Sequence, residues 1–265
     1  IPGGYTVGGT VTYASVTASR LGRRPGVLTR IGPDLALPDL FRDIELYALP
    51  SDHTLTFENV YTPDGRVQTI HALGGPIGKE DVPASLVQAA PPIILLGPLA
   101  GELDPDVATF FPNSLRGVVP QGWMRRWDEH GRVSHVPIAC EADVLRHADV
   151  LVVSTEDVNH DVSLAQCYAE TVSIVVLTRG MHGADVYYNG HVTHVRPRPA
   201  LQVDPTGAGD TFTAAFLIYY QETGDPIRAA RFANVAASFS VEGISYSGAP
   251  ARAQVEAYLA EHGWL

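Results

Sequence analysis

The sequence predicts a layered α/β domain in which helices flank a central, mostly parallel sheet. A short strand is predicted at 27–31, and short apolar runs at 93–96, 118–119, 150–153 and 174–177 are each bounded by turn-forming or small polar residues. Unbroken apolar runs of this length are typical of strands covered on both faces, as in parallel sheets. Helical patterns lie between them, which favours strand–helix–strand units. We expect these elements to form one domain over residues 1–265.

Seven segments are predicted to be helical, and one region departs from the alternation of strands and helices. The helices are expected at 10–21, 104–111, 141–147, 162–171, 210–221, 226–241 and 251–261. In the departing region, 53–61 and 66–72 alternate apolar and polar residues around the turn Pro63-Asp64-Gly65. Period-two alternation on both sides of a turn predicts a half-exposed antiparallel hairpin. We therefore expect a small β excursion within 44–73.

The charge balance of the chain excludes several classes of partner and site. The 265 residues carry 29 acidic and 18 basic side chains, a formal net charge of −11, which disfavours nucleic acid and anionic membranes as partners. No apolar run approaches the 18 or more residues of a membrane span. Seventeen of the basic residues are arginines and Lys79 is the single lysine, followed by Glu80. A P-loop needs Ser or Thr after its lysine, so this phosphate-binding motif is excluded.

Cysteine and histidine usage points away from disulfides and metal sites. The two cysteines, Cys140 and Cys167, are expected to be buried packing residues in a protein of the reducing cytoplasm. His191 and His194 follow the turn Tyr188-Asn189-Gly190 and lie three positions apart on a predicted strand. Their side chains would point to opposite faces, so they are not expected to share a metal.

The segment 204–210 carries the strongest chemical signal in the chain. It reads Asp-Pro-Thr-Gly-Ala-Gly-Asp and is followed directly by an amphipathic run. Gly207, Ala208 and Gly209 would therefore lie at a helix N-terminus, where free amides and the helix dipole stabilise an anion. Asp210, in the first turn, is placed to accept a proton from an attacking hydroxyl during phosphoryl transfer. From these residues alone, a structural helix cap is an equally good interpretation.

This segment resembles the C-terminal signature of the ribokinase family, also called the PfkB carbohydrate kinases. The resemblance extends over most of the chain. Gly8-Gly9 with the following small-residue helix is similar to the family's di-glycine region, and Gly32-Pro33-Asp34 to its G-x-D turn. The segments 178–183 and 232–237 resemble the nucleotide-side loop and the helix that closes the adenine pocket. The resemblance implies a ribokinase-like fold in which the excursion at 44–73 is a small β lid over the substrate.

The resemblance also implies roles for individual residues, with ATP and Mg²⁺ as cofactors. Asp210 would be the catalytic base, and the amides of Gly207, Ala208 and Gly209 would form the anion hole for the γ-phosphoryl group. On the nucleotide side the implied residues are Thr178, Arg179, Gly180, Gly183 and Asn234. On the substrate side they are Gly8, Gly9, Thr12 and Tyr13. The segment 120–128 resembles inositol-kinase-like members, which adds Gln121 and Arg125 as ligands of a polyhydroxylated substrate. In the alternative interpretation, Trp123 and Trp127 pack the loop and its arginines are solvated.

Three departures from the family pattern mark where this chain differs. The family's opening strand has no counterpart before Ile1, and we expect that it was cropped or is disordered. Tyr13 occupies the position of a sugar-binding Asn. The N-x-x-E motif tied to Mg²⁺ is replaced by Ser154-Thr155-Glu156-Asp157, so Glu156 and Asp157 are candidates for indirect metal contacts. A structural reading, in which Ser154 ends a strand and the two carboxylates cap a helix, is equally open.

Taken together, the sequence predicts ATP-dependent phosphorylation of a hydroxyl on a small sugar or polyol, with a cyclitol such as inositol preferred. A nucleoside kinase of the same family is the nearest alternative. A sugar or nucleotide sensor that keeps the fold without turnover is an alternative from another class. The sequence leaves the oligomeric state open, and the strand edges of the lid offer one way to pair two copies in a homodimer.

Overall fold

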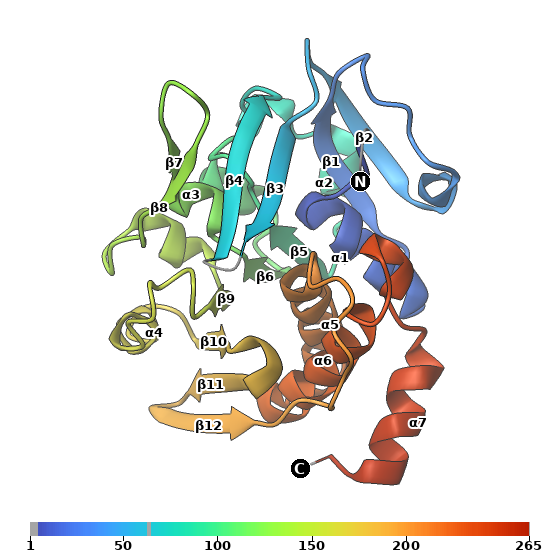
Figure 1. Cartoon of the computed structure of the whole chain (residues 1–265), viewed down its shortest axis with the longest axis vertical. Helices are drawn as coiled ribbons and strands as arrows, with labels where there is room; N and C mark the ends of the chain where they lie inside the picture. Colours follow the sequence, from blue (N-terminus) through green and yellow to red (C-terminus); the bar gives the residue numbers. More distant parts are fainter. Residues whose placement is uncertain (1–4, 63–64, 265) are drawn as a thin grey trace.

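A six-stranded sheet forms the centre of the computed structural model, which describes residues 5–62 and 65–264. Its strand order is β12-β11-β10-β9-β6-β5, and it runs through the lower half of the molecule in Figure 1. Strands β5, β6, β9 and β10 pair in parallel, whereas β11 and β12 are antiparallel additions. The strands are β5 (Ile93–Leu96), β6 (Leu115–Val118), β9 (Val150–Ser154), β10 (Ile174–Thr178), β11 (Ala184–Tyr188) and β12 (His191–Val195).

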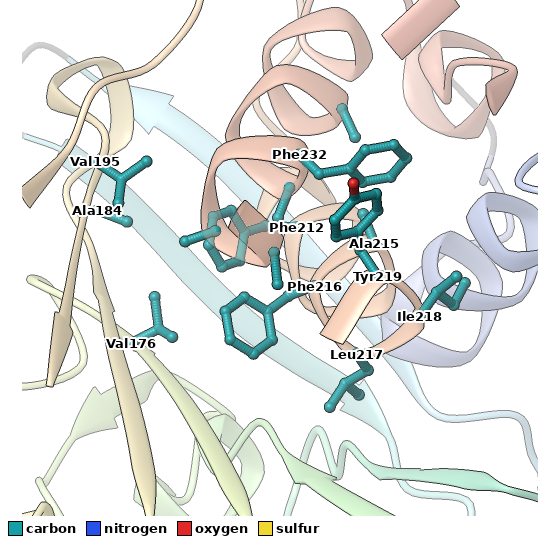
Figure 2. Packing of buried hydrophobic residues seen from close by; sticks show 14 of the residues in the cluster. Val176, Ala184, Val195, Phe212, Ala215, Phe216, Leu217, Ile218, Tyr219 and Phe232 are labelled. Carbon is teal, nitrogen blue, oxygen red and sulfur yellow. The ribbon is translucent and has the colours of Figure 1, made fainter. Parts of the chain in front are cut away.

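Both faces of this sheet are buried, as the unbroken apolar runs predict. Along β9, Val150 and Val152 pack against helices α5 (Ala208–Thr223) and α6 (Pro226–Ser240), while Leu151 and Val153 pack on the opposite face. Figure 2 shows the first of these layers, where Phe216 of α5 lies next to Val176 of β10 and Phe232 of α6 packs on Tyr219. Successive strand residues alternate between two cores, which explains why the sequence shows no polar alternation there.

The helices α1 (Gly9–Arg20), α5, α6 and α7 (Arg252–His262) confirm the predictions within two residues. Helix α4 (Ser163–Tyr168) is shorter than expected. The segments predicted as helices at 104–111 and 141–147 are instead 3₁₀ turns, η3 (Pro105–Phe110) and η4 (Asp143–His147). Pro112, two residues after η3, and the two residues between η4 and β9 leave no room for a longer helix. Shorter elements are α2 (Ala84–Gln88), α3 (Gln121–Met124), η1 (Asp39–Asp43), η2 (Lys79–Asp81), η5 (Gly180–His182) and η6 (Ser245–Gly248).

Three two-stranded ribbons lie at the other end of the molecule (Figure 1). They are β1 (Gly26–Ile31) with β2 (Glu45–Pro50), β3 (Thr56–Thr62) with β4 (Gly65–Ala72), and β7 (Arg125–Trp127) with β8 (Val133–His135). The antiparallel lid hairpin is therefore confined to β3 and β4, and Pro63 and Asp64 of its turn lie outside the described residues. Residues 45–50 instead pair in parallel with β1, because Val27, Phe41 and Ile44 bury a small core of their own.

An apolar cavity of about 500 Å³ separates the β1–β2 ribbon from the edge strand β5 of the main sheet. Helices α1 and α5 form its floor, with Ala14, Ala18 and Leu217 among the lining residues. The main sheet and the β1–β2 ribbon are thus two separate sheets on either side of this cavity.

The two cysteines were predicted to be unpaired packing residues, but the structure joins Cys140 and Cys167 in a disulfide with their Cα atoms 5.9 Å apart. The hydroxyl of Tyr168 donates to the carbonyl of Ile138 at 2.9 Å and holds the loop before η4 against α4. This contact lies beside the two cysteines, which are 27 positions apart in the sequence. The expectation that they only fill space is wrong.

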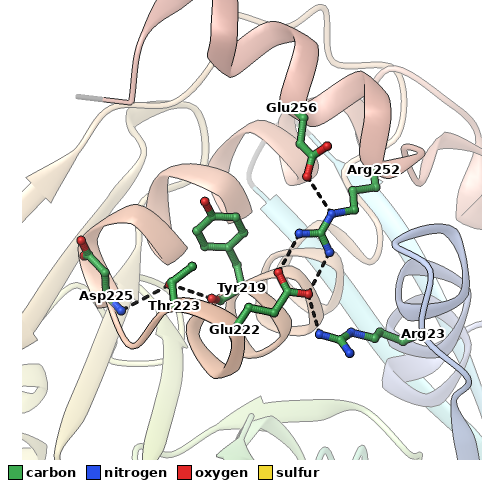
Figure 3. Close-up of polar contacts among 7 residues, drawn as sticks. All are labelled: Arg23, Tyr219, Glu222, Thr223, Asp225, Arg252 and Glu256. Carbon is green, nitrogen blue, oxygen red and sulfur yellow. Dashed lines mark hydrogen bonds and ion pairs between the residues drawn. The ribbon is translucent and has the colours of Figure 1, made fainter.

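A network of ion pairs surrounds Glu222 in the last turn of α5 (Figure 3). Glu222 accepts hydrogen bonds from Arg252 at 2.6 and 2.8 Å and from Arg23 at 2.5 Å, and Arg252 also reaches Glu256 at 2.7 Å. These contacts tie the loop after α1 and helix α7 to the last turn of α5. Within the described residues, no helix is both long and apolar enough to cross a membrane.

Candidate functional site

The Gly-rich turn at the start of α5 has a backbone that only glycine adopts easily. Gly207 precedes the helix in the left-handed conformation, with φ 79° and ψ 3°. A Cβ atom at Gly207 would lie 2.1 Å from the ring of Tyr13, whereas one at Gly209 would meet no heavy atom within 4 Å. The carboxylate of Asp204 accepts hydrogen bonds from the amides of Thr206 at 2.9 Å and Ser245 at 2.8 Å, which fixes the turn. Sterics thus require glycine at 207 and leave open space at 209.

The amides of this turn are arranged as the start of a helix. The first amides of any α-helix have no carbonyl partner within the helix and can bind an anion. The amide of Ala208 donates to the carbonyl of Pro205 at 3.2 Å, and the amide of Thr211 closes the first turn on Gly207 at 2.9 Å. An anion would therefore compete with a long hydrogen bond at Ala208.

Asp210 is half-buried beside this turn, and its environment raises the pKa of its carboxyl group. Burial raises its pKa to about 6, and the charge of Asp157 adds to the rise. A hydrogen bond from the Thr10 side chain and the charge of Arg125 act in the opposite direction. A carboxylate with a pKa near 6 is ionised at neutral pH and still basic enough to accept a proton, which suits a general base.

Arg125 links Asp210 to the lid. Its side chain is buried and donates to the carbonyl of Leu99 at 2.8 Å and to Gln121 Oε1 at 2.6 Å. Its guanidinium carbon lies 4.9 Å from the ring centre of Phe57 on lid strand β3. The structure therefore brings Gln121 and Arg125 together and places Arg125 close enough to act on the pKa of Asp210.

A cavity of about 430 Å³ opens next to these residues, lined by the backbone of Gly101 and Gly122 and by Trp123, Arg125 and Trp127 among others. The indole of Trp123 donates to the carbonyl of Leu103 at 2.9 Å, so this ring is held by the protein itself. The size of the cavity matches a small polar ligand.

The di-glycine segment is placed differently from a simple substrate-binding loop. Gly9 has φ 77° and packs on Leu99. A Cβ atom added at Gly8 would lie 3.8 Å from the ring of Tyr13. Thr12 is fully buried and its hydroxyl donates to the carbonyl of Gly8 at 2.7 Å. Tyr13 is buried against Gly207, with its hydroxyl 3.3 Å from Ser245 Oγ. Thr12 and Tyr13 thus contact other protein groups, whereas Thr10 faces Asp210.

The loop that replaces the N-x-x-E motif forms a closed hydrogen-bonded turn after β9. Asp157 Oδ2 accepts from the amide of Ser154 at 2.8 Å, and Ser154 Oγ accepts from the amide of Asp157 at 3.1 Å. The other carboxylate oxygen of Asp157 accepts from His135 Nε2 at 3.1 Å. Asp157 is buried and acts on the pKa of Asp210, whereas Glu156 is exposed. Of the two predicted carboxylates, Asp157 is the one that the structure brings into the site.

The predicted nucleotide-side residues surround the loop between β10 and β11. Gly180 and Gly183 have positive φ values of 53° and 89°, which explains their residue type. Arg179 forms an ion pair with Asp185, and the hydroxyl of Thr178 donates to the carbonyl of Val153 at 3.3 Å.

The fifth residue predicted on the nucleotide side is Asn234, on α6. It is buried and donates its amide to the carbonyls of Val195 and Arg196. The amide of Asn234 and the Arg179 guanidinium are therefore engaged within the protein.

Thr10 and His135 belong to this site but were not among the predicted site residues. Thr10 is buried on α1 and hydrogen bonds to Asp210, and His135 ends the β7–β8 ribbon next to Asp157. Neither residue stands in a distinctive motif. Thr10 follows the di-glycine directly, which is the one local signal that points to it.

Known proteins resemble this chain in sequence and in fold. The model of the pfkB family carbohydrate kinases matches residues 141–251, which include β9 to β12, α5 and α6. Inositol 3-kinase of Zea mays is 27% identical over 239 residues, covering 80% of this chain and 60% of that protein. The chain thus spans about 60% of the length of this curated relative.

Solved structures extend the similarity to the whole fold. A sulfate complex of a pyrophosphate-dependent kinase in the ribokinase family has a TM-score of 0.80 at 22% identity, covering 94% of this chain and 91% of that one. Ribokinase of Arabidopsis thaliana complexed with ribose and ATP has a TM-score of 0.74 at 23% identity, covering 95% and 87%. The chain therefore has a ribokinase-like fold, and its residues 141–251 are similar to the pfkB family carbohydrate kinases.

Proposed function

We propose that this protein transfers a phosphoryl group from ATP to a hydroxyl of a small sugar or polyol, with a cyclitol such as inositol as the preferred acceptor. The observation that carries the proposal is the assembly of Asp210, with its raised pKa, at the Gly-rich N-terminus of α5 and next to Arg125. The acceptor class is supported by the similarity to a plant inositol 3-kinase and by the cavity beside Arg125.

In the proposed reaction, the acceptor hydroxyl attacks the γ-phosphorus and Asp210 takes the hydroxyl proton. The bond between the γ-phosphorus and the bridging oxygen breaks, and ADP leaves. The amides at the start of α5 stabilise the charge on the transferring group without a lysine. The lid, held to Arg125 through Phe57, would exclude water from the reacting centre.

The residues around Asp157 fit a Mg²⁺ ion that arrives with the donor. Among the residues that the structure describes, no three His, Cys, Asp or Glu side chains are grouped to hold a metal by themselves. Mg²⁺ typically uses one or two carboxylates together with substrate phosphates and water. Asp157 supplies one buried carboxylate of this kind. Bound there, Mg²⁺ would neutralise phosphate charge.

Pyrophosphate is a second candidate donor. One of the similar structures is a pyrophosphate-dependent kinase. In addition, Asn234 and Arg179, which the family resemblance assigns to the nucleotide, are engaged in bonds within this protein. Pyrophosphate has no adenine base, so its binding would need neither of these side chains.

The test is a two-way panel of acceptors and donors. Sugars, cyclitols and nucleosides are incubated with magnesium and either ATP or pyrophosphate, and phosphorylated product is detected directly by ³¹P NMR. We expect turnover with cyclitols and ATP, with kcat rising as pH increases through about 6, because Asp210 must be ionised. Product only with pyrophosphate would change the donor, and product only with nucleosides would change the acceptor class. Silence across the panel would favour a non-catalytic sensor.

The role of Asp210 is tested by Asp210→Asn. We expect kcat to fall by about 10³-fold or more, with donor binding retained, because the general base is removed. Asp143→Asn is the control, since that exposed carboxylate pairs only with Arg146 in the described structure. Near-normal turnover of Asp210→Asn would refute the assigned role. Dimerisation through the lid remains a prediction, testable by light scattering.

A further inference from the structure

The β7–β8 ribbon brings two basic side chains to the two carboxylates of the site. Arg125 on β7 and His135 on β8 are directly paired across the ribbon. Residues opposite each other in an antiparallel pair project from the same face. Arg125 acts on Asp210, and His135 donates to Asp157 at 3.1 Å. One short ribbon thus places one side chain near each of the two carboxylates.

The hydrogen bond from His135 completes the surroundings of the Asp157 carboxylate. The Asp157 side chain is 8% exposed, and one of its carboxylate oxygens accepts a hydrogen bond from the amide of Ser154. A buried carboxylate needs a partner for each oxygen to offset its lost hydration. His135, whose side chain is 25% exposed, supplies the partner for the other oxygen. Two contacts from different elements therefore set the orientation of this carboxylate.

The ribbon itself is anchored by other bonds. The amide of Ile70 on lid strand β4 donates to the carbonyl of Gly131 at 2.8 Å, and the amide of Val136 donates to Met124 at 2.7 Å. A further bridge joins Thr69 to Arg132. Because these backbone bonds hold the ribbon in place, the contact between His135 and Asp157 is not needed to fold it.

We propose that His135 is a positioning residue that fixes the Asp157 carboxylate for the magnesium-bound phosphates of the donor. This inference rests on the proposed phosphoryl transfer. It gives the Ser154–Asp157 turn, which lacks the Asn and Glu of the family motif, a histidine from another part of the chain as its orienting group. Partners that orient a metal-binding carboxylate typically matter for metal affinity as much as for structure.

The experiment compares His135→Ala with His135→Gln, whose amide restores a hydrogen-bond donor. Calorimetric titration of the folded protein with ADP, and separately with pyrophosphate, is repeated over a range of Mg²⁺ concentrations. We expect His135→Ala to raise the Mg²⁺ concentration for half-maximal binding of ADP or pyrophosphate by about tenfold. We expect His135→Gln to recover most of this loss.

His147→Ala is the matched control, because His147 pairs with Asp106 on the 3₁₀ turns, outside the site. It should bind donor and Mg²⁺ like the unmodified protein. An unchanged Mg²⁺ requirement in His135→Ala would overturn the proposal, as would a Gln variant as impaired as Ala. A His135→Ala protein that fails to fold would assign the bond a structural role and also overturn it. Calorimetry needs no turnover, so a silent acceptor panel would refute the proposed function without deciding this comparison.

Discussion

The two ends of helix α5 each carry a carboxylate, and the protein shifts the pKa values of the two carboxylates in opposite directions. Asp210 lies in the first turn, where the helix dipole favours a negative charge, yet burial raises its pKa to about 6. Glu222 lies in the last turn, where the dipole disfavours a negative charge, yet hydrogen bonds from Arg252 and Arg23 lower its pKa (Figure 3). The local helix position therefore predicts the wrong sign at both ends.

Under the proposed function, the difference separates a reactive carboxylate from a structural one. At Asp210 the protein leaves a charge poorly compensated, which costs stability and provides basicity. At Glu222 it surrounds the charge with arginines, which contributes stability and removes reactivity.

Gly207→Ala should damage the reactive end most. A methyl group there would enter the Tyr13 ring and force a positive φ on alanine, so we expect a loss of about 3 kcal/mol or more in the free energy of unfolding. The melting temperature would fall by roughly 6 °C or more. Gly209→Ala is the matched control, because a methyl group there meets open space and alanine favours a helix. Equal losses in the two variants would contradict the strict requirement at 207.

Asp210→Asn should make the protein more stable at neutral pH while it abolishes turnover. The folded state holds the Asp210 proton up to a pKa of about 6, against 3.8 for an unperturbed carboxyl, so stability falls as pH rises between these values. Asn removes this penalty, and we expect a gain of about 2–3 kcal/mol at pH 7 that disappears below about pH 4. Denaturant unfolding at both pH values measures it. A variant less stable than the unmodified protein at pH 7 would show that Asp210 is well compensated.

Glu222→Gln should have the smaller and opposite effect. Because the pKa of Glu222 is lowered, its stabilisation is present at neutral pH and is lost as pH falls through the folded-state pKa. We expect a loss of about 1 kcal/mol at pH 7 with kcat unchanged. Glu256→Gln, which removes one more exposed partner of Arg252, should cost under about 0.5 kcal/mol. Equal costs would mean that the network adds nothing beyond single ion pairs.

Much of the fold was predictable from local patterns. The strands at 93–96, 150–153 and 174–177 were confirmed because both neighbours of each strand bury it, and that environment leaves an unbroken apolar run. The predictions of helices at 104–111 and 141–147 were wrong, because α-helical and 3₁₀ patterns are alike over so few residues. The disulfide was missed because spacing alone does not bring two cysteines together.

The sequence by itself determined the backbone of the candidate site. Glycine at 207 and an aspartate three residues later specify a helix start with a carboxylate in its first turn, since backbone conformation depends on neighbouring residues. Only the tertiary structure decided what that carboxylate does. Thr10, Arg125 and Asp157, which act on the pKa of Asp210, come from three distant segments. Desolvation and charge are properties of the folded surroundings, so no local pattern encodes them.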